Sequence, residues 1–253
     1  MRPSPQLSIC WSIKMNRLLL GLTAGLLAAG ISLSAHAGGT LEEGKEAANL
    51  GQYPKAVEIF RSLADQGDAV AQYNLAQLYF RGLGVERDPE QASALYRQSA
   101  EKGYAEAQYM LASLHFRREL PLRDYAEAVQ WYRRAAEQGH VKSQLNLGDL
   151  YFKGEVVDLD LPEAMRWFRL AAAQGEAVAQ HHMGMLYIDG QGVPADVETG
   201  YMWLVLAIQN ADPRYSMKLG KILNFIGTKL TEPQKASAVA RAERCRNSKY
   251  QEC

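Results

Sequence analysis

A period of 36 residues runs through most of the chain, and it restricts the possible fold more than any other feature. Apolar residues follow it, for example at Leu95, Trp131, Trp167 and Trp203. Three other residue types recur at the same spacing: Gln72, Gln108, Gln144 and Gln180; Gly67, Gly103, Gly139 and Gly175; Asp88, Asp124, Asp160 and Asp196. Self-similarity at a fixed spacing of this length indicates an array of small structural units stacked in a row.

Each unit has the pattern of two antiparallel helices. In the first unit Ala71, Leu75 and Leu78 follow the i, i+4, i+7 spacing of one helical face. A glycine-containing turn comes next, and Asp88, which precedes a proline, is the expected N-cap of the second helix. Gly103 is the expected glycine just past the end of that helix. We assign the same two roles to the other periodic aspartates and glycines.

Two units also carry a capping-box pattern. Glu127 and Glu163 follow their aspartates by three residues, the spacing at which a glutamate side chain can accept a hydrogen bond from the backbone of the N-cap. A helical hairpin of this size cannot bury its apolar face alone, so neighbouring hairpins are expected to stack. The prediction is an all-α fold, a solenoid of stacked antiparallel helix pairs.

The period also divides the chain into segments. Four repeats are predicted, at residues 71–106, 107–142, 143–178 and 179–213. Residues 38–70 share the second-helix pattern but have a shorter turn, and are predicted to form an N-terminal hairpin. Residues 214–253 are predicted to form capping helices and a tail, because the ends of such arrays need a polar outer face.

The first 37 residues have the pattern of a secretory signal peptide. Asn16 and Arg17 precede an apolar run over residues 18–33. The run is followed by Ala35-His36-Ala37, the A-x-A pattern of a signal-peptide cleavage site. A membrane anchor is the weaker alternative, because the run is shorter than the ~20 apolar residues of a spanning helix. We expect cleavage near Ala37 and a periplasmic or secreted chain. Met15 is an alternative start.

Charge and cysteine content narrow the classes of partner. Without residues 1–37 the chain has 25 Lys and Arg against 28 Asp and Glu, which argues against nucleic-acid binding. Cys10 lies in the leader, so Cys245 and Cys253 remain. Two thiols in an exported chain favour a disulfide between them. An intermolecular bridge through Cys253 is the alternative.

The sequence offers no convincing catalytic or metal-binding motif. The glycine-containing loops follow helices and lack the Lys-Ser/Thr of a phosphate-binding loop. His181 and His182 are adjacent, so on a helix they would point about 100° apart and could not chelate one ion together. His115 occupies a slot that tyrosine holds in other units, and His140 follows a loop glycine. We expect no enzyme activity, no metal and no cofactor.

A binding surface is predicted from the slots that vary between units. On the first helix of each unit these slots are spaced i, i+4, i+8: Tyr73, Gln77 and Arg81; Tyr109, Ser113 and Arg117; Leu145, Asp149 and Lys153; His181, Met185 and Asp189. We expect them to form an exposed stripe on the concave side, the side that solenoids use for binding. Tyr and Arg are also enriched in binding hot spots. Solvated positions without a binding role are the alternative.

The unit AQYNLAQLYFRGLGVERDPEQASALYRQSAEKG, residues 71–103, resembles the Sel1-like repeat, a relative of the tetratricopeptide repeat. The resemblance covers about residues 40–211, and residues 38–70 look more like a tetratricopeptide hairpin. It implies a right-handed α-solenoid that serves as an adaptor, and exported bacterial relatives are implicated in envelope assemblies. The chain departs from the pattern where Arg118, Leu120, Val156 and Ala211 replace turn glycines.

Two functions follow from these observations. We expect a periplasmic adaptor that binds a protein partner of unknown identity through its concave face. A binder of peptidoglycan or exopolysaccharide, with Tyr73 and Tyr109 as stacking platforms, is the alternative. It is weakened because their slot passes to Leu145 and His181 in later units. Once the leader is removed, we expect neither a membrane-spanning segment nor a basic amphipathic helix.

Overall fold

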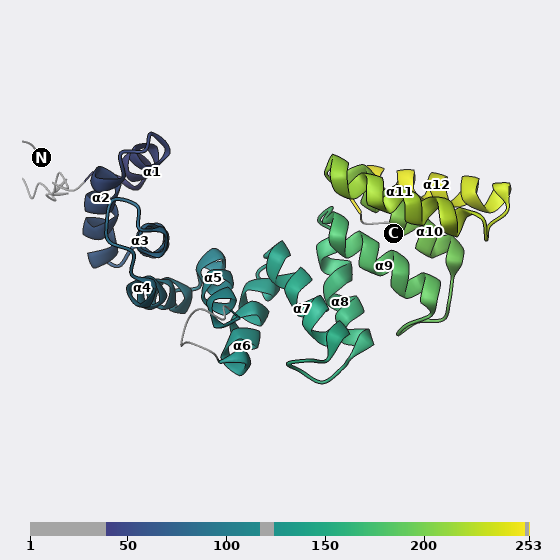
Figure 1. Ribbon diagram of the computed structural model, residues 1–253, viewed down its shortest axis with the longest axis horizontal. Helices are drawn as coiled ribbons and strands as arrows, with labels where there is room; N and C mark the ends of the chain where they lie inside the picture. Colours follow the sequence, from purple (N-terminus) through teal and green to yellow (C-terminus); the bar gives the residue numbers. More distant parts are fainter. Residues whose placement is uncertain (1–38, 117–123, 251–252) are drawn as a thin grey trace, which may run out of the picture. The chain divides into compact units, whose positions relative to one another are not determined.

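The computed structural model describes residues 39–116, 124–250 and 253, so the predicted leader, Arg117, Arg118 and Leu120 lie outside the described part. The described residues form α-helices and no strand, which confirms the predicted all-α class (Figure 1). The helices are α1 (Leu41–Asn49), α2 (Tyr53–Asp65), α3 (Ala69–Arg81), α4 (Pro89–Glu101), α5 (Ala105–His115), α6 (Tyr125–Glu137), α7 (Val141–Lys153), α8 (Leu161–Ala172), α9 (Ala177–Asp189), α10 (Val197–Asn210), α11 (Pro213–Gly227) and α12 (Glu232–Asn247).

The helices pack in chain order. Odd- and even-numbered helices pair into hairpins from α1–α2 to α9–α10, and each second helix also contacts the first helix of the next hairpin (Figure 1). The C-terminal end differs, because both α11 and α12 pack against α10. Antiparallel pairs stacked in this way form an α-solenoid, as predicted. None of the described helices is both long enough and apolar enough to cross a bilayer.

Periodic aspartates and glycines lie where the helices begin and end. Asp88, Asp124, Asp160 and Asp196 are the N-caps of α4, α6, α8 and α10. In each, a carboxylate oxygen accepts a hydrogen bond from the backbone N–H three residues later, at 2.8–2.9 Å. Gly67, Gly103, Gly139 and Gly175 have φ between +83° and +91°, where a side chain would be strained. These contacts explain why both residue types recur at one position of every unit.

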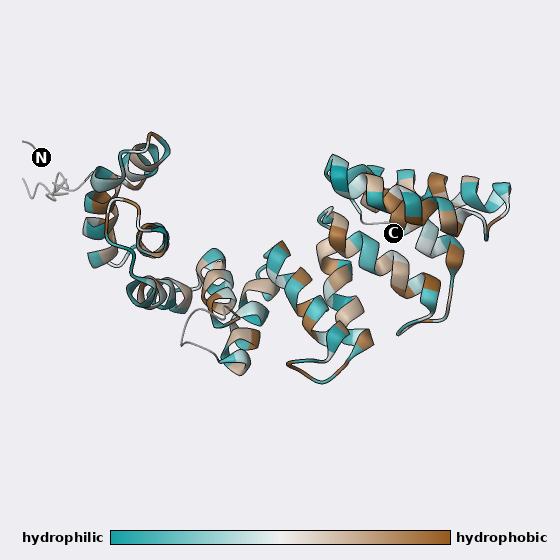
Figure 2. Ribbon diagram, in the orientation of Figure 1, coloured by the Kyte–Doolittle hydropathy of each residue, from teal (hydrophilic) through white to brown (hydrophobic). Residues whose placement is uncertain are grey.

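The core is built from a large residue on each second helix and a small residue on the facing first helix. Phe168 packs against Gly148 so closely that a Cβ at Gly148 would lie 2.5 Å from the ring. Phe60 lies equally close to Gly44, and Leu204 contacts Gly184. Apolar and polar patches alternate along the helices in Figure 2, as expected when only one face of each helix is buried.

Each periodic glutamine connects two hairpins by hydrogen bonds. Gln108, Gln144 and Gln180 are buried. The Nε2 of each donates to a carbonyl at the end of the preceding second helix, at 3.0 Å. The Oε1 of each accepts from an amide 30 residues later, at 2.7–2.9 Å. The glutamine therefore ties the end of one hairpin to the end of the next, a role that its period alone did not reveal.

Replacing Gln144 with leucine is expected to lower the free energy of unfolding by about 1–3 kcal/mol, because the Ala136 carbonyl and the Gln174 amide would lose a buried partner. Urea unfolding followed by circular dichroism measures the effect. Gln130 is exposed on α6, and leucine there should change stability by less than about 0.5 kcal/mol. Equal effects at the two positions would contradict the proposed role of the glutamine.

Candidate functional site

The predicted stripe lies on the first helices α3, α5, α7 and α9, but it is not evenly exposed. Arg81, Lys153 and Asp189 are exposed. The remaining described members are half-buried: Tyr73, Gln77, Tyr109, Ser113, Leu145, Asp149, His181 and Met185. Arg117 lies outside the described residues. These side chains are therefore less exposed than we expected, and in three of the four units the first residue of the stripe contacts the unit that follows.

Aromatic contacts between units show why this slot is covered. The Tyr73 ring lies 5.2 Å from the ring of Tyr104, and the Tyr109 ring lies 4.8 Å from that of His140. Tyr104 and His140 are the N-cap residues of the next first helices. His181 makes the corresponding contact with Tyr215, whose Oη lies 2.9 Å from its Nδ1. Tyr73 and Tyr109 thus stabilise the stack as well as face the surface.

Two adjoining cavities lie beside the N-terminal part of the stripe. The larger, about 570 Å³, is lined by Tyr73, Gln77, Phe80, Arg81, Tyr96, Glu106, Tyr109, Met110, His140, Val141 and Lys142. The smaller, about 340 Å³, is lined by Lys45, Ala48, Asn49, Tyr53, Phe60, Asn74, Gln77, Leu78, Arg81 and Leu83. Both are lined by Gln77 and Arg81, so they lie next to each other, and we call the two together the α1–α7 groove after the first and last helices that line it.

Aromatic and cationic side chains both line the groove. Burial raises the pKa of Tyr73 and lowers the pKa of His140, so both side chains are neutral at pH 7. Lys45, Arg81 and Lys142 bring three positive charges, whereas Glu106 is the one acidic residue among the lining residues. Such a surface can bind apolar groups and carboxylates.

A third cavity, of about 510 Å³, contains two later members of the stripe, Asp149 and Lys153. Ser113 lies apart from these cavities, and its Oγ is 3.0 Å from the Oη of Tyr132. Leu145, His181, Met185 and Asp189 line none of the three cavities. Stripe residues on α3 and α5 therefore line the α1–α7 groove, whereas the stripe residues on α9 line none of these cavities.

Sequence reasoning missed several groove residues. Glu106, His140 and Lys142 lie in or next to the first turn of α5 or α7, and Lys45 lies on α1. Neighbouring hairpins stack so that the start of each first helix lies beside the middle of the first helix before it. The residues at the starts of α5 and α7 therefore lie close to the stripe. Residues about 31 positions apart, such as Tyr109 and His140, contact each other in the structure. A search for pairs of side chains at this spacing could have identified these groove residues from the sequence.

The two glutamates of the predicted capping boxes have another role. Both oxygens of Glu127 accept hydrogen bonds from Arg97 on α4, and one also accepts from the indole of Trp131 at 3.0 Å. Glu163 likewise accepts from Arg166 and Trp167 at 2.8 Å. The capping-box expectation was wrong for these residues, because a tryptophan one turn later and an arginine compete for the carboxylate.

The pairing with Arg97, followed by the hydrogen bond from Trp131, lowers the pKa of Glu127 from 4.5 to about 2. A carboxylate with a depressed pKa stabilises the fold above pH 4.5, and this contribution is lost as the pH falls towards 2. We expect it to be about 1–2 kcal/mol, because Arg97 is 42% exposed and solvent screens the pair.

Thermal unfolding of wild type and Glu127→Gln between pH 2 and 7 measures this contribution. The variant should be less stable near pH 7 and should approach wild type near pH 2. Glu90→Gln on the exposed side of α4 should leave the wild-type pH profile unchanged. Parallel profiles for wild type and Glu127→Gln would show that the carboxylate is not the titrating group.

Histidines in the described part serve packing. The His182 ring stacks on Phe168, with centroids 4.5 Å apart, and the Nδ1 of His115 accepts a hydrogen bond from the backbone N–H of Asp124 at 3.2 Å. Among the residues that the structure describes, no three His, Cys, Asp or Glu side chains are grouped as metal ligands.

Most of the chain matches a known family of repeat sequences. The Sel1 repeat family matches residues 42–68, 69–104, 105–140, 141–176 and 177–212. The first match covers the hairpin that we had likened to a tetratricopeptide unit, and the later units begin two residues before our repeat boundaries. No curated protein matches the chain.

Two solved structures are similar over much of the chain. A Sel1 repeat protein from Oxalobacter formigenes is 31% identical, with a TM-score of 0.65, over 68% of this chain and 71% of that one. The protein c5321, a protective antigen present in uropathogenic Escherichia coli strains and displaying an SLR fold, is 33% identical with a TM-score of 0.70. The match covers 87% of this chain but only 47% of c5321.

Proposed function

The chain belongs to the Sel1 repeat family, and from this premise we propose that it is a non-enzymatic scaffold that binds a partner protein in the α1–α7 groove. Proteins of this family are generally non-catalytic and mediate protein–protein interactions. The observation that carries the proposal is that two cavities share Gln77 and Arg81 and are together lined by residues of four successive hairpins.

An extended segment of a partner protein fits the chemistry of this groove. Asn49 and Gln77 present amide side chains, which can donate to and accept from a peptide backbone. Tyr109 and Met110 offer apolar contact area, and Arg81 and Lys142 favour an acidic side chain or a terminal carboxylate. We therefore expect a segment that combines an apolar residue with a nearby negative charge.

We place this interaction in the periplasm or outside the cell, within a cell-envelope assembly. Support comes from the leader pattern of residues 1–37 and from the two cysteines that remain after its removal. Glycan binding is the less favoured function. The rings of Tyr73 and Tyr109 pack against Tyr104 and His140, and a sugar platform would need open ring faces.

Affinity capture from the native envelope tests the proposal, with the mature protein as bait. The variant Arg81→Glu with Lys142→Glu reverses two exposed charges in the groove. The matched control Lys55→Glu with Arg169→Glu reverses two exposed charges on second helices. A protein that wild type and control retain and the groove variant loses is the expected result, and titration with that purified protein should repeat the difference.

Retention of glycan alone would support the alternative function. Equal retention of the protein by all three baits would show that its binding site is not the α1–α7 groove. Circular dichroism of each bait ensures that a loss of binding is not a loss of fold.

A further inference from the structure

Helix α11 occupies the position of a first helix, but none of the described helices pairs with it as a second helix does in the earlier hairpins. It packs against α10 as each earlier first helix packs against the preceding second helix. Instead of folding back along α11, α12 runs along α10. Ser237, Arg241 and Arg246 of α12 donate hydrogen bonds to Glu198, Thr199 and Gln209 at 2.7–3.2 Å.

Gly220 shows that the partner's place on α11 is open. It lies 36 residues after Gly184 and 72 after Gly148, in the small-residue slot that faces the second helix of the same hairpin. A Cβ at Gly148 would lie 2.5 Å from Phe168, and one at Gly184 would lie 3.0 Å from Leu204. A Cβ at Gly220 would meet no described atom within 4 Å. The recess that a large residue fills in those hairpins is therefore unfilled here.

Helix α11 also exposes apolar and basic side chains, of which Met217 lies nearest to Gly220 around the helix. Met217 is 66% exposed and Phe225 is 64% exposed. Arg214, Lys218 and Lys221 are exposed on the same helix. We call these five residues and Gly220 the α11 surface.

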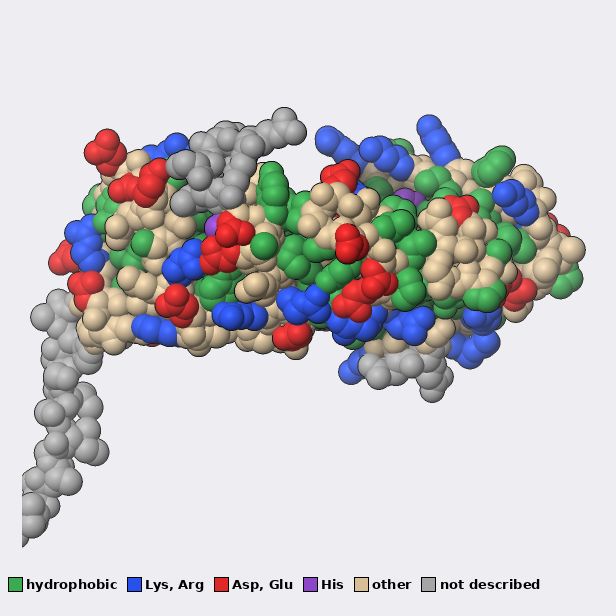
Figure 3. Space-filling model, turned by 90° about the horizontal axis from the view of Figure 1, so that it is seen from below, with side chains coloured by type: hydrophobic (Ala, Val, Ile, Leu, Met, Phe, Trp, Pro, Cys, Tyr) green, Lys and Arg blue, Asp and Glu red, His purple; other side chains and the backbone are tan. Residues whose placement is uncertain are grey.

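The charge of this end of the chain differs from that of the repeats. Residues 213–253 contain nine Lys and Arg against three Asp and Glu, whereas residues 38–212 contain sixteen against twenty-five. Lysine and arginine side chains project at the margins of the right half of the view in Figure 3. Negative charge on a partner would therefore favour its binding to the α11 surface.

We propose that the α11 surface binds an amphipathic, acidic helix of a partner protein, which takes the place of the missing second helix. The helix would present Phe, Tyr or Leu towards Gly220, because these types hold the facing slot in the hairpins of this chain: Phe60, Tyr96, Tyr132, Phe168 and Leu204. Acidic residues on its flank would lie near Arg214 and Lys221. This surface is separate from the α1–α7 groove, and its occupant does not depend on what the groove binds.

A labelled peptide tests the proposal on the whole mature protein. The probe is residues 161–174 of this chain, which contain Phe168, with Arg166→Glu and Arg169→Glu to make the helix acidic. Fluorescence anisotropy should show binding that weakens as salt is added. Phe168→Ala in the probe should weaken binding about tenfold, as loss of an aromatic anchor does at protein interfaces.

Two protein variants locate the site. Gly220→Leu fills the recess and should weaken binding of the probe at least about tenfold while leaving the fold intact, because no described atom lies near its Cβ. Lys221→Glu should weaken binding through charge alone. Ala236→Leu adds the same apolar bulk to an exposed position of α12 and should bind the probe as wild type does.

Three outcomes would overturn the proposal. One is equal binding of the probe by wild type, Gly220→Leu and Lys221→Glu. Another is failure of the probe to bind together with binding of wild type to phosphatidylglycerol vesicles, which would assign the surface to a bilayer. The third is self-association in sedimentation that Phe225→Ser abolishes, which would assign it to a second copy.

Discussion

Replacing Gly200 with alanine is expected to lower the free energy of unfolding by about 3 kcal/mol, whereas the same change at Gly220 should raise it by about 0.5–1 kcal/mol. Both glycines lie within helices, so intrinsic helix propensity favours alanine at each. At Gly200 the new Cβ would lie 2.4 Å from Cγ1 of Ile188 and 2.7 Å from the carbonyl oxygen of Gly184. A backbone oxygen can move only if α9 moves, so the packing of α9 on α10 would be disrupted.

Urea unfolding of the two variants beside wild type measures this difference. Trp131, Trp167 and Trp203 are buried on α6, α8 and α10, so tryptophan fluorescence reports on three successive hairpins, and circular dichroism reports on all helices. The Gly200→Ala transition should come at lower urea by both probes. A neutral result at Gly200 would mean that α9 and α10 can separate at little cost, and destabilisation at Gly220 would mean that the α11 recess is already filled.

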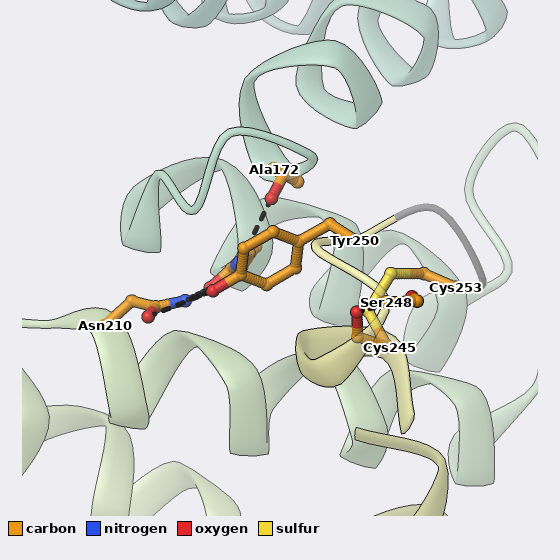
Figure 4. The surroundings of a disulfide bond; sticks show 7 residues. Ala172, Asn210, Cys245, Ser248, Tyr250 and Cys253 are labelled. Carbon is orange, nitrogen blue, oxygen red and sulfur yellow. Dashed lines mark hydrogen bonds between the residues drawn. A yellow bond between two sulfur atoms is a disulfide. The ribbon is translucent and has the colours of Figure 1, made fainter. Parts of the chain in front are cut away.

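Removing the disulfide is expected to lower the free energy of unfolding by about 2–3 kcal/mol, by the chain entropy of a short closed loop. The bond joins Cys245, which is buried at the end of α12, to Cys253, across a Cα–Cα distance of 4.9 Å (Figure 4). Its loop contains Lys249 and Tyr250, both with positive φ, at 53° and 64°. Side chains at such angles are strained, and the closed loop holds them there.

The loop also holds Tyr250 against the end of the stack. Its hydroxyl lies 2.9 Å from the Nδ2 of Asn210 and 3.2 Å from the Oδ1 of the same residue (Figure 4). Asn210 in turn donates to Gln180, the last of the periodic glutamines. Opening the disulfide would release Tyr250 and expose the end of this chain of hydrogen bonds, so the loss of stability should be concentrated in α10 and α12.

Thermal unfolding of wild type with and without reductant, and of Cys253→Ser, tests this expectation. Reduced wild type and the variant should unfold together, below oxidised wild type, and reductant should not affect the variant. Tyr250→Phe should cost only about 1 kcal/mol, the value of its hydrogen bonds. If a non-reducing gel shows a dimer that Cys253→Ser abolishes, the bond is intermolecular. If oxidised and reduced wild type unfold together, the bond does not contribute.

Local features of this protein followed directly from its sequence. The all-α class came from the helical spacing of residues such as Ala71, Leu75 and Leu78, and the helix starts came from aspartates such as Asp88 before Pro89. Both signals act within about four residues, which is the range of helical hydrogen bonds and caps. The repeat then required hairpins to stack, because one hairpin cannot bury its own apolar face.

The tertiary structure decided whatever depends on how neighbouring hairpins meet. In the stack, the ring of Tyr104 packs on Tyr73, and Glu127 accepts a hydrogen bond from Arg97 instead of completing a capping box. His140 and Lys142 line the same cavity as Arg81. The tertiary structure also placed α12 along α10 and left the recess at Gly220 open. These contacts join residues far apart in the chain, and their geometry depends on the angle between stacked helices. The period fixes which residues recur, but side-chain packing sets that angle.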